Sequence, residues 1–412
     1  MGEIERIVVA GGGQAGASAA AKLRALGYEG ALTLVGEEAE LPYQRPPLSK
    51  KYMMGQMAFD QLLIKPQAFY ETNDIALRLG VAVAGVDCAA RSMTLADGSR
   101  LAWDRLLLAT GSTPRQLPPA LTAGFDKTYL VRTLADVDRL EPMVATAGHV
   151  LVVGGGYIGL EAAASARHFG CAVTLVEAAE RILQRVAAPQ TSTRVAALHR
   201  EHQVDLREGV GLDGLERRDD SRCTARLSDG SELTTDVVIV GIGVAPHTAV
   251  AEAAGLAIDN GIAVDQYCRT SDPAVFAAGD CASFPWRGRR IRLESVQNAI
   301  DQGEAAAANM LGHETVYDPV PWFWSDQYDA KLQIAGLNQG YERTIERKGA
   351  REGASSVWYF AGTDLLAVDA FNDAAAYMVG KRLLEAGVSP PIDAVADDAR
   401  PVKDLMPARP PR

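Results

Sequence analysis

The sequence has little of what marks several classes of protein. Its cysteines are too few and too scattered for a disulfide-stabilised secreted fold, at Cys88, Cys171, Cys223, Cys268 and Cys281. Its longest apolar runs fall short of the roughly 18 residues that a membrane-spanning helix needs. The first apolar run begins at Ile7, which leaves no room for a secretory signal. We therefore expect a cytoplasmic protein without a membrane span.

The chain also lacks an excess of positive charge. It carries 41 Lys and Arg against 52 Asp and Glu, a formal net charge of -11. Nucleic-acid affinity comes mainly from cations that neutralise phosphates, so a general nucleic-acid binder is not expected. The six histidines never fall at metal-ligand spacing with one another or with a cysteine, so we predict no metal site.

What the sequence does have is enough apolar material for more than one folded domain. Hydrophobic residues make up 48% of the 412 residues and charged residues 23%, which is ordinary for globular proteins. A chain of this length is too long for one hydrophobic core, so two or three domains are expected.

An internal repeat indicates how two of those domains are built. Residues 7–38 and 150–180 each contain a β-branched run, a GxGxxG motif, an alanine-rich helical stretch and a second apolar run that ends in an acid. Four glycines of the first copy recur 143 positions later: Gly11, Gly13, Gly16 and Gly27 correspond to Gly154, Gly156, Gly159 and Gly170. We interpret each copy as a βαβ unit that binds a dinucleotide.

The three glycines of each motif have separate physical roles. The first permits the tight turn after the strand, the second lets a pyrophosphate approach the backbone, and the third lets helix and strand pack closely. Inside the second motif, Tyr157 and Ile158 are predicted to line the same nucleotide. A third match, at 209–214, is followed by 216–220 (ERRDD) instead of an apolar helix, so we discard it.

The acids at the ends of the second apolar runs predict the sugar preference. Glu37, with Glu38 as the near alternative, and Glu177 are positioned to accept hydrogen bonds from ribose hydroxyls. A carboxylate at Glu177 repels a 2'-phosphate, which favours NADH over NADPH. The alternative for Glu177 is a solvated acid at a strand end.

Five further segments occur in an order that makes a family resemblance specific. They are 41–50 (LPYQRPPLSK), 109–111 (ATG), 276–280 (FAAGD), 294–299 (ESVQNA) and 322–327 (WFWSDQ). With the two glycine motifs, they make essentially the whole chain resemble the FAD-dependent NADH:ferredoxin reductases of bacterial oxygenase and cytochrome P450 systems, the putidaredoxin reductase and aromatic-ring dioxygenase reductase type.

The resemblance implies an α/β, glutathione-reductase-like fold with two Rossmann-type dinucleotide-binding domains and a C-terminal α+β domain. FAD would occupy the first glycine motif and NADH the second. The FAD-binding domain would be discontinuous, formed by 1–113 and 245–319, with the NADH-binding domain at 114–244. A C-terminal domain would cover 320–412 and end in a disordered tail at 408–412.

The resemblance also implies cofactor-binding residues, taken position by position. Asp280 would accept hydrogen bonds from ribityl hydroxyls, Arg45 and Arg132 would hold phosphate or carbonyl oxygens, and Val83 would wall the adenine. The helix expected after Ser295 would turn its N–H groups toward the flavin. The predicted set also includes the glycines of the two motifs. Its other members are Ala15, Glu37, Lys50, Ala109, Thr110, Gly111, Gly243, Gly279 and Val296. Asp280 and Arg132 could instead be ordinary caps or ion pairs.

Two charged residues are the candidates to act at the hydride-transfer step. By resemblance, Lys50 lies beside flavin N5 and pairs with Glu161, two residues after the second glycine motif. Such a pair could position the nicotinamide and tune the charge around N5. The alternative is a surface lysine and a first-turn glutamate stabilised by the helix dipole.

The cysteine positions bear on where the electrons go. Disulfide reductases of this fold need two closely spaced cysteines beside the flavin, and no two here are that close. Related NADH oxidases and peroxidases use one cysteine in the stretch that here reads 45–50 (RPPLSK), and this stretch has no cysteine. We therefore predict that the flavin passes electrons outward one at a time, to a [2Fe-2S] ferredoxin.

Two surface features are predicted to serve that partner. Trp324, with its neighbour Trp322, would stand at the flavin edge, although both could be core aromatics. Ferredoxins of this type are acidic, so the first docking candidate is the densest cationic cluster, which consists of Arg287, Arg289, Arg290 and Arg292. The alternative for this cluster is a solvated loop.

Two other functions are possible for this fold: a rubredoxin reductase and an NADH-sensing flavoprotein like apoptosis-inducing factor. A membrane quinone reductase finds no amphipathic C-terminal anchor to support it.

Overall fold

A computed structural model describes residues 4–122, 125–218 and 222–407, which form two compact units. Unit 1 comprises 1–45, 58–113 and 244–319, and unit 2 comprises 46–57, 114–243 and 320–412. The chain thus changes unit close to the predicted limits at 113, 244 and 319. Two groupings were not expected: residues 46–57 belong with unit 2, and the predicted NADH-binding and C-terminal domains form one unit. The predicted disordered tail, 408–412, lies outside the described residues.

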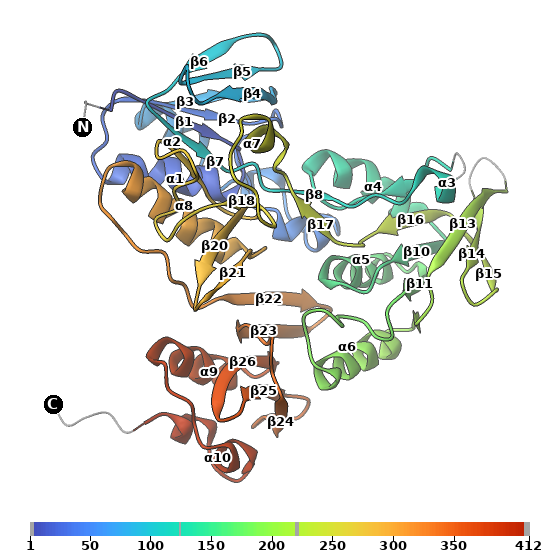
Figure 1. The fold of residues 1–412 in the computed structure, drawn as a ribbon. Coiled ribbons are helices and arrows are strands. Elements are labelled where there is room, and N and C mark those ends of the chain that lie inside the picture. Colours follow the sequence, from blue (N-terminus) through green and yellow to red (C-terminus); the bar gives the residue numbers. More distant parts are fainter. Residues whose placement is uncertain (1–3, 123–124, 219–221, 408–412) are drawn as a thin grey trace. The chain divides into compact units, whose positions relative to one another are not determined.

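Unit 1 is organised around a five-stranded parallel sheet (Figure 1). In spatial order its strands are β19 (Val275–Ala277), β7 (Arg105–Leu108), β1 (Arg6–Ala10), β2 (Ala31–Val35) and β3 (Ile75–Arg78). Strands β1 and β7 are almost wholly apolar, as expected for a parallel sheet covered on both faces. Helices α1 (Gln14–Ala25) and α8 (Val296–Met310) pack so closely that a Cβ on Gly303 would lie 2.6 Å from the carbonyl oxygen of Ala15.

Unit 2 contains a second sheet of the same design. Its order is β12 (Val204–Glu208), β11 (Ala172–Glu177), β10 (His149–Val153), β16 (Val237–Val240) and β9 (Thr128–Tyr129), again all parallel. Helix α5 (Tyr157–His168) connects β10 and β11, as α1 connects β1 and β2. Helices α4 (Leu134–Thr146) and α6 (Pro189–Glu201) complete the layers. The repeat seen in sequence is therefore a repeat of whole domains.

Each parallel sheet carries a three-stranded antiparallel sheet inserted at the same point of the repeat. In unit 1 it is β4 (Val83–Asp87), β5 (Ser92–Leu95) and β6 (Arg100–Ala102), between β3 and β7. In unit 2 it is β13 (Leu212–Arg217), β14 (Cys223–Leu227) and β15 (Glu232–Thr235), between β12 and β16. The discarded glycine match falls here, with Gly214 inside β13, so rejecting it was correct.

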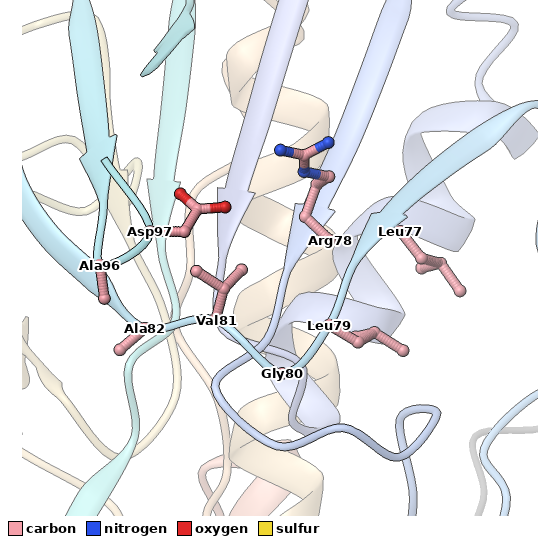
Figure 2. A pocket seen from close by; sticks show the side chains of 8 residues that line it. All are labelled: Leu77, Arg78, Leu79, Gly80, Val81, Ala82, Ala96 and Asp97. Atoms are coloured by element: carbon pink, nitrogen blue, oxygen red, sulfur yellow. The ribbon is translucent and has the colours of Figure 1, made fainter. Parts of the chain in front are cut away.

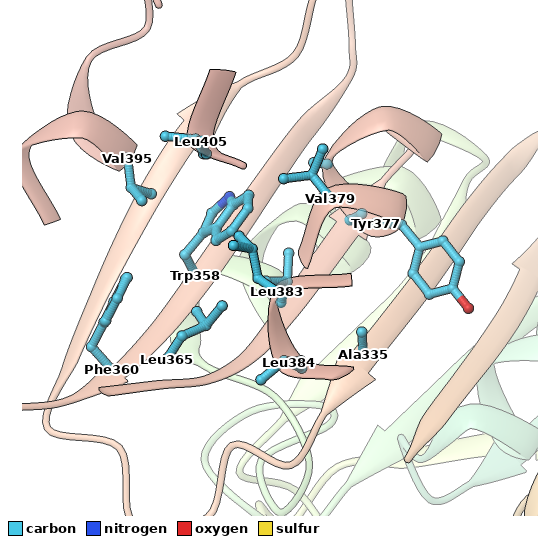
Figure 3. Close-up of a cluster of buried hydrophobic side chains, with 13 residues drawn as sticks. Ala335, Trp358, Phe360, Leu365, Tyr377, Val379, Leu383, Leu384, Val395 and Leu405 are labelled. Carbon is cyan, nitrogen blue, oxygen red and sulfur yellow. The ribbon is translucent and has the colours of Figure 1, made fainter. Parts of the chain in front are cut away.

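The last part of unit 2 is a five-stranded antiparallel sheet with a helix on one face. Its order is β22 (Trp322–Gln327), β23 (Ala330–Gly336), β26 (Asp364–Phe371), β25 (Ser355–Ala361) and β24 (Arg343–Lys348). Helix α9 (Ala374–Ala386) and the short α10 (Ile392–Ala396) cover a core that includes Trp358 and Leu383 (Figure 3). The opposite face carries Tyr359 and Ala367, which pack against Ala188 before α6.

Because side chains of a strand alternate between the two faces of its sheet, β22 divides its residues between two neighbours. Trp322 packs on the α9 side, against Tyr377. Phe323 points the other way and contacts Tyr157 of α5, with ring centroids 4.6 Å apart. The C-terminal sheet thus has one face for its own core and one for the β10–β16 domain.

Candidate functional site

The two glycine turns have nearly the same geometry. Gly11 and Gly154 have φ of +133° and +106°, and a Cβ there would lie 2.0 Å from Ala109 O and 2.5 Å from Gly241 O. A Cβ on the third glycine, Gly16 or Gly159, would lie 1.9 or 2.0 Å from the carbonyl oxygen of the first. Only glycine fits these positions, which agrees with the tight turn and the close helix packing predicted for them.

The second glycine of each motif has open space instead. A Cβ on Gly13 would meet nothing within 4 Å, and one on Gly156 only Gly241 O at 3.9 Å. Both glycines are N-cap residues, and neither α1 nor α5 has a side chain that caps it. Helices α4, α8 and α9 do have one. The first-turn N–H groups of α1 and α5 are therefore available to a phosphate, and both turns fit a dinucleotide.

The acid predicted at the end of each second strand has a different environment in the two copies. Glu37 is exposed, whereas Glu38 accepts hydrogen bonds from Tyr43 and, at 2.6 Å, from Arg45. Glu37 therefore stays the candidate for a ribose contact, because Glu38 is already bound by Tyr43 and Arg45. Glu177 accepts the N–H groups of Gly155 at 2.7 Å and Ala179 at 2.8 Å, so its charge is fixed beside the second turn.

Most of the predicted FAD residues gather around the ends of the parallel strands of unit 1. Asp280 follows β19 and accepts a hydrogen bond from Ser112 at 2.9 Å. The Thr110 hydroxyl donates to the carbonyl of His247 at 2.6 Å, so it holds a loop. Gly279 N–H donates to Gln302 at 2.8 Å, and a Cβ on Gly279 would lie 3.0 Å from that of Ala15.

The remaining predicted FAD residues lie further apart along the chain. Val83 begins β4, and Val296 begins α8, whose predicted start is confirmed by Ser295, which accepts the N–H of Asn298. Arg132, in unit 2, immediately precedes Thr133, the N-cap of α4. Gly243, with φ of +94°, follows β16, and its carbonyl accepts the N–H of Arg115 at 2.9 Å.

A hollow in unit 1 has Ala82, the neighbour of Val83, in its wall. It measures about 560 Å³ and is lined by 77–82 with Ala96 and Asp97 (Figure 2). Its wall contains the charged side chains of Arg78 and Asp97 and the apolar side chains of Leu77, Leu79 and Val81. None of the predicted site residues lines it, so we assign it no role.

The predicted pair of Lys50 and Glu161 forms within unit 2. Lys50 Nζ donates to Glu161 Oε2 at 2.6 Å, and the two side chains are 16% and 3% exposed. Lys50 follows the short helix η1 (Pro46–Ser49), and Glu161 projects from the second turn of α5. A carboxylate this buried needs a partner for its charge, so the pair is more than a solvated lysine beside a helix end.

Two serines that the sequence did not single out complete the surroundings of this carboxylate. Ser49 Oγ donates to Glu161 Oε2 at 2.6 Å, and Ser325 Oγ donates to Glu161 Oε1, also at 2.6 Å. Ser165 of α5 donates to the Ser49 carbonyl at 2.7 Å and so holds η1 on the helix. Ser49 adjoins Lys50 and Ser325 adjoins Trp324, but nothing in those strings indicated a shared partner.

The two tryptophans are not equivalent. Trp322 lies against Tyr377 and beneath the ammonium of Lys381, with 5.5 Å between Nζ and the ring centroid, so it mostly covers the C-terminal core. Trp324 is half-buried and contacts Trp322 and Phe323, with ring centroids 5.7 and 6.4 Å away. Of the two, Trp324 remains the candidate for an exposed redox edge.

The four arginines of the predicted docking cluster also differ in their contacts. Arg290 donates to the carbonyls of Ser283 and Val264, and Arg292 to that of Asp280 and to Glu294. Arg287 and Arg289, in the hairpin of β20 (Ala282–Trp286) and β21 (Arg289–Ile291), lie over the Trp286 ring at 4.6 and 5.3 Å. Arg290 and Arg292 thus bind backbone carbonyls, and Arg287 and Arg289 pack over the Trp286 ring.

All five cysteines are free thiols in unreactive surroundings. Four are buried and Cys88 is partly buried, and burial raises the pKa of each of the five. Cys281, next to Asp280, points to the carbonyls of Leu108 and Ala278 at 3.5 and 3.4 Å. A reactive thiolate needs a lowered pKa, so none of these residues is suited to a sulfur relay.

In the described part of the chain, no helix is long and apolar enough to span a membrane.

Comparison with known proteins gives matches over nearly the whole chain. Residues 5–303 match the pyridine nucleotide-disulphide oxidoreductase family, and 322–406 match the reductase C-terminal family. The 5,5'-dehydrodivanillate O-demethylase ferredoxin reductase subunit of Sphingobium sp. is 42% identical over 98% of both chains. Putidaredoxin reductase CamA of Pseudomonas putida is 38% identical over 99% of this chain and 98% of its own. The reductase in the crystal structure of the covalent putidaredoxin reductase–putidaredoxin complex superposes with a TM-score of 0.93, covering 97% and 98%.

Proposed function

The chain belongs to the pyridine nucleotide-disulphide oxidoreductases, and we propose that it takes hydride from NADH onto FAD and passes the electrons singly to a [2Fe-2S] ferredoxin feeding an oxygenase or a cytochrome P450. When bound, FAD supplies the step from a two-electron donor to a one-electron acceptor. The observation that carries this proposal is the pair of glycine turns with room for two dinucleotides, in a protein whose thiols are unsuited to relay electrons. The names of its relatives, as ferredoxin reductases of oxygenase and cytochrome P450 systems, support the choice of acceptor.

Lys50 and Glu161 are proposed to act at the hydride-transfer step. Their contact at 2.6 Å supports this role, because it fixes an ammonium at the end of η1 with little freedom to move. The ammonium would orient the nicotinamide and set the charge near flavin N5, and Glu161 would keep it in place. Trp324 is proposed to line the edge from which electrons leave, which its partial exposure supports.

Glu177 is proposed to select NADH against NADPH. Its two hydrogen bonds to backbone N–H groups support this, because they hold a negative charge where a 2'-phosphate would have to lie. Glu37 is proposed to hold the ribose of FAD in the same manner. The two acids would thus serve two different nucleotides.

The ferredoxin is proposed to dock on the β20–β21 hairpin through Arg287 and Arg289. Their place in an exposed hairpin, over the Trp286 ring, supports this choice. Such cations would steer an acidic partner and raise the association rate at low ionic strength. A cytoplasmic location is part of the same proposal, and five unpaired cysteines support it.

One titration tests the central proposal. The purified protein is reduced anaerobically with NADH or with NADPH and mixed with a [2Fe-2S] ferredoxin while flavin absorbance is followed. We expect a yellow protein, rapid bleaching by NADH and recovery of colour on adding ferredoxin. Cytochrome c reduction should depend on ferredoxin, and rubredoxin should replace it poorly. A protein that stays colourless after FAD is supplied would overturn the proposal.

Rubredoxin dependence would instead indicate a rubredoxin reductase. Slow oxidation of NADH with a long-lived charge-transfer complex would indicate a sensor like apoptosis-inducing factor.

A further inference from the structure

Glu161 uses both oxygens of its buried carboxylate, and the two oxygens have different partners. Oε2 accepts from Lys50 and Ser49, which both come from residues 46–57, whereas Oε1 has Ser325 of β22 as its one hydrogen-bond partner among the described residues. The carboxylate cannot rotate without breaking one of these contacts. A hydrogen bond from the C-terminal sheet therefore fixes the orientation of a group that belongs to the nucleotide-binding domain.

A chain of hydrogen bonds continues behind Ser325. Gln327 Nε2 donates to Ser325 Oγ at 3.1 Å, and His199 Nε2 lies 2.8 Å from Gln327 Oε1. Ser325, Gln327 and His199 are 1%, 4% and 0% exposed, so none of these bonds competes with water. Gln327 is two residues after Ser325 and shares its face of β22, which places both toward α5 and α6.

The chemistry of each group determines which partner donates and which accepts in these hydrogen bonds. A carboxylate can only accept, so Ser325 must donate to Glu161, and the Ser325 oxygen is left to accept from the amide nitrogen of Gln327. The amide oxygen of Gln327 then requires a proton on His199 Nε2. Burial lowers the pKa of His199 to about 4, so the ring is neutral near pH 7 and its Nδ1 faces the Tyr328 hydroxyl at 3.4 Å. Each link donates toward Glu161.

We propose that Ser325 is a positioning residue for hydride transfer, which acts through Glu161 to hold the Lys50 ammonium in place, and that Gln327 and His199 keep its hydroxyl pointed at Glu161. This inference rests on the proposed role of Lys50. It assigns the C-terminal domain a part in the reaction of the NADH-binding domain. The hydroxyl of residue 325 is the decisive group, because alanine would leave Oε1 with no partner in a site that water does not reach.

The test compares Ser325→Ala with Ser325→Thr, which keeps the hydroxyl, in the full-length holoenzyme. A matched control is Thr344→Ala, which removes a hydrogen bond of 2.9 Å from Gln190 across the same interface of domains but away from Glu161. The first readout is the rate at which an amine-reactive reagent labels Lys50, measured by peptide mapping against its exposed neighbour Lys51. The second is the rate of flavin reduction as a function of NADH concentration.

We expect Ser325→Ala to raise the labelling of Lys50 relative to Lys51 severalfold. It should slow the limiting rate of flavin reduction roughly tenfold, the effect of one hydrogen bond to a charged group, with little change in the NADH dissociation constant. Ser325→Thr should restore both values, and Thr344→Ala should change neither. Gln327→Leu, one link further away, should change both in the same direction by a smaller factor.

Unchanged labelling and rate in Ser325→Ala would overturn the proposal, and so would equal changes in Thr344→Ala. If Ser325→Ala fails to fold, Gln327→Leu decides: native labelling of Lys50 in that variant overturns the proposal. A failure of the proposed function looks different, because Lys50→Gln would then leave flavin reduction untouched while labelling in Ser325→Ala still increased.

Discussion

The two glycine turns share a backbone but differ in what their helices carry. At the position of Glu161, counted back by 143 residues, α1 has Ser18, and at the position of Ile158 it has Ala15. Ala15 is buried against α8, whereas Ile158 is 43% exposed at the start of α5. The comparison teaches that the turns are alike where a phosphate would touch the backbone, and that they differ at the buried carboxylate of Glu161, where α5 meets η1 and β22.

The largest effect is expected from breaking the turn itself. Gly11→Ala would place a Cβ 2.0 Å from Ala109 O at a φ of +133°, so we expect a loss of about 3 kcal/mol of unfolding free energy and of bound FAD. Gly13→Ala meets nothing within 4 Å and should leave the stability of the FAD-free protein within about 0.5 kcal/mol while weakening FAD binding. Calorimetry and flavin content measure both. Equal destabilisation by the two variants would contradict the assigned roles.

The second prediction compares the two positions that differ most, Glu161 and Ser18. Glu161→Gln leaves the Lys50 ammonium, 16% exposed, without its carboxylate, so we expect about 3 kcal/mol of destabilisation and roughly 100-fold slower flavin reduction. Ser18→Ala, at the matching position of α1, should change stability by no more than about 0.5 kcal/mol and leave the rate unchanged. Stopped-flow absorbance and thermal unfolding are the measurements. A native rate in Glu161→Gln would remove this pair from the mechanism.

The third prediction concerns pH, because unit 2 buries two ionisable groups between α6 and the C-terminal sheet. Burial raises the pKa of Asp369, which accepts from Thr191 at 2.7 Å, from 3.8 to about 6, and it lowers the pKa of His199 from 6.5 to about 4. The stability from Asp369 is complete below pH 3.8 and lost as the pH rises to about 6. That from His199 is complete above pH 6.5 and lost as the pH falls to about 4.

These two contributions oppose each other between pH 4 and 6 and partly cancel in the native protein. Relative to the native protein, the unfolding free energy of Asp369→Asn should increase with rising pH across this range. That of His199→Gln should decrease, each by on the order of 3 kcal/mol. Unfolding midpoints measured at several pH values test this. Hydrogen exchange should show the change in unit 2, because both Asp369 and His199 lie there. Parallel pH profiles for native and variant proteins would contradict it.

The smallest effect is expected from neutralising Glu177 and Glu37, the two acids proposed to bind ribose. Glu177→Gln should reduce the preference for NADH over NADPH by roughly tenfold, since the repulsion of a 2'-phosphate is lost. Glu37→Gln, in the first copy, should weaken FAD binding and leave the nucleotide preference unchanged. Flavin reduction by each nucleotide measures the preference. If native protein already uses both equally, the role of Glu177 is wrong.

Much of this arrangement could be predicted because its signals are local. Glycines at fixed spacing required particular turns, and the structure has them at Gly11 and Gly154. Ser295 signalled the start of α8 because a cap and its helix are adjacent in sequence. Ser325 could not be found in this way, since 164 residues separate it from Glu161. Nor could the grouping of 46–57 with unit 2, because no sequence pattern indicates which neighbour a loop will contact.

The alternation of β22 also has a consequence for protein engineering. The predicted boundary near residue 320 invites the construction of chimaeras that join one reductase's nucleotide-binding part to another's tail. Such a hybrid would carry the other protein's residue at position 325, and Glu161 would therefore have a different neighbour. The side chains of its β22 would still alternate between the two faces of the sheet. Even a one-residue error at the junction would turn Ser325 away from α5. Under the role proposed for Ser325, exchanging the C-terminal domain for any other purpose would therefore also change the reduction of the flavin by NADH.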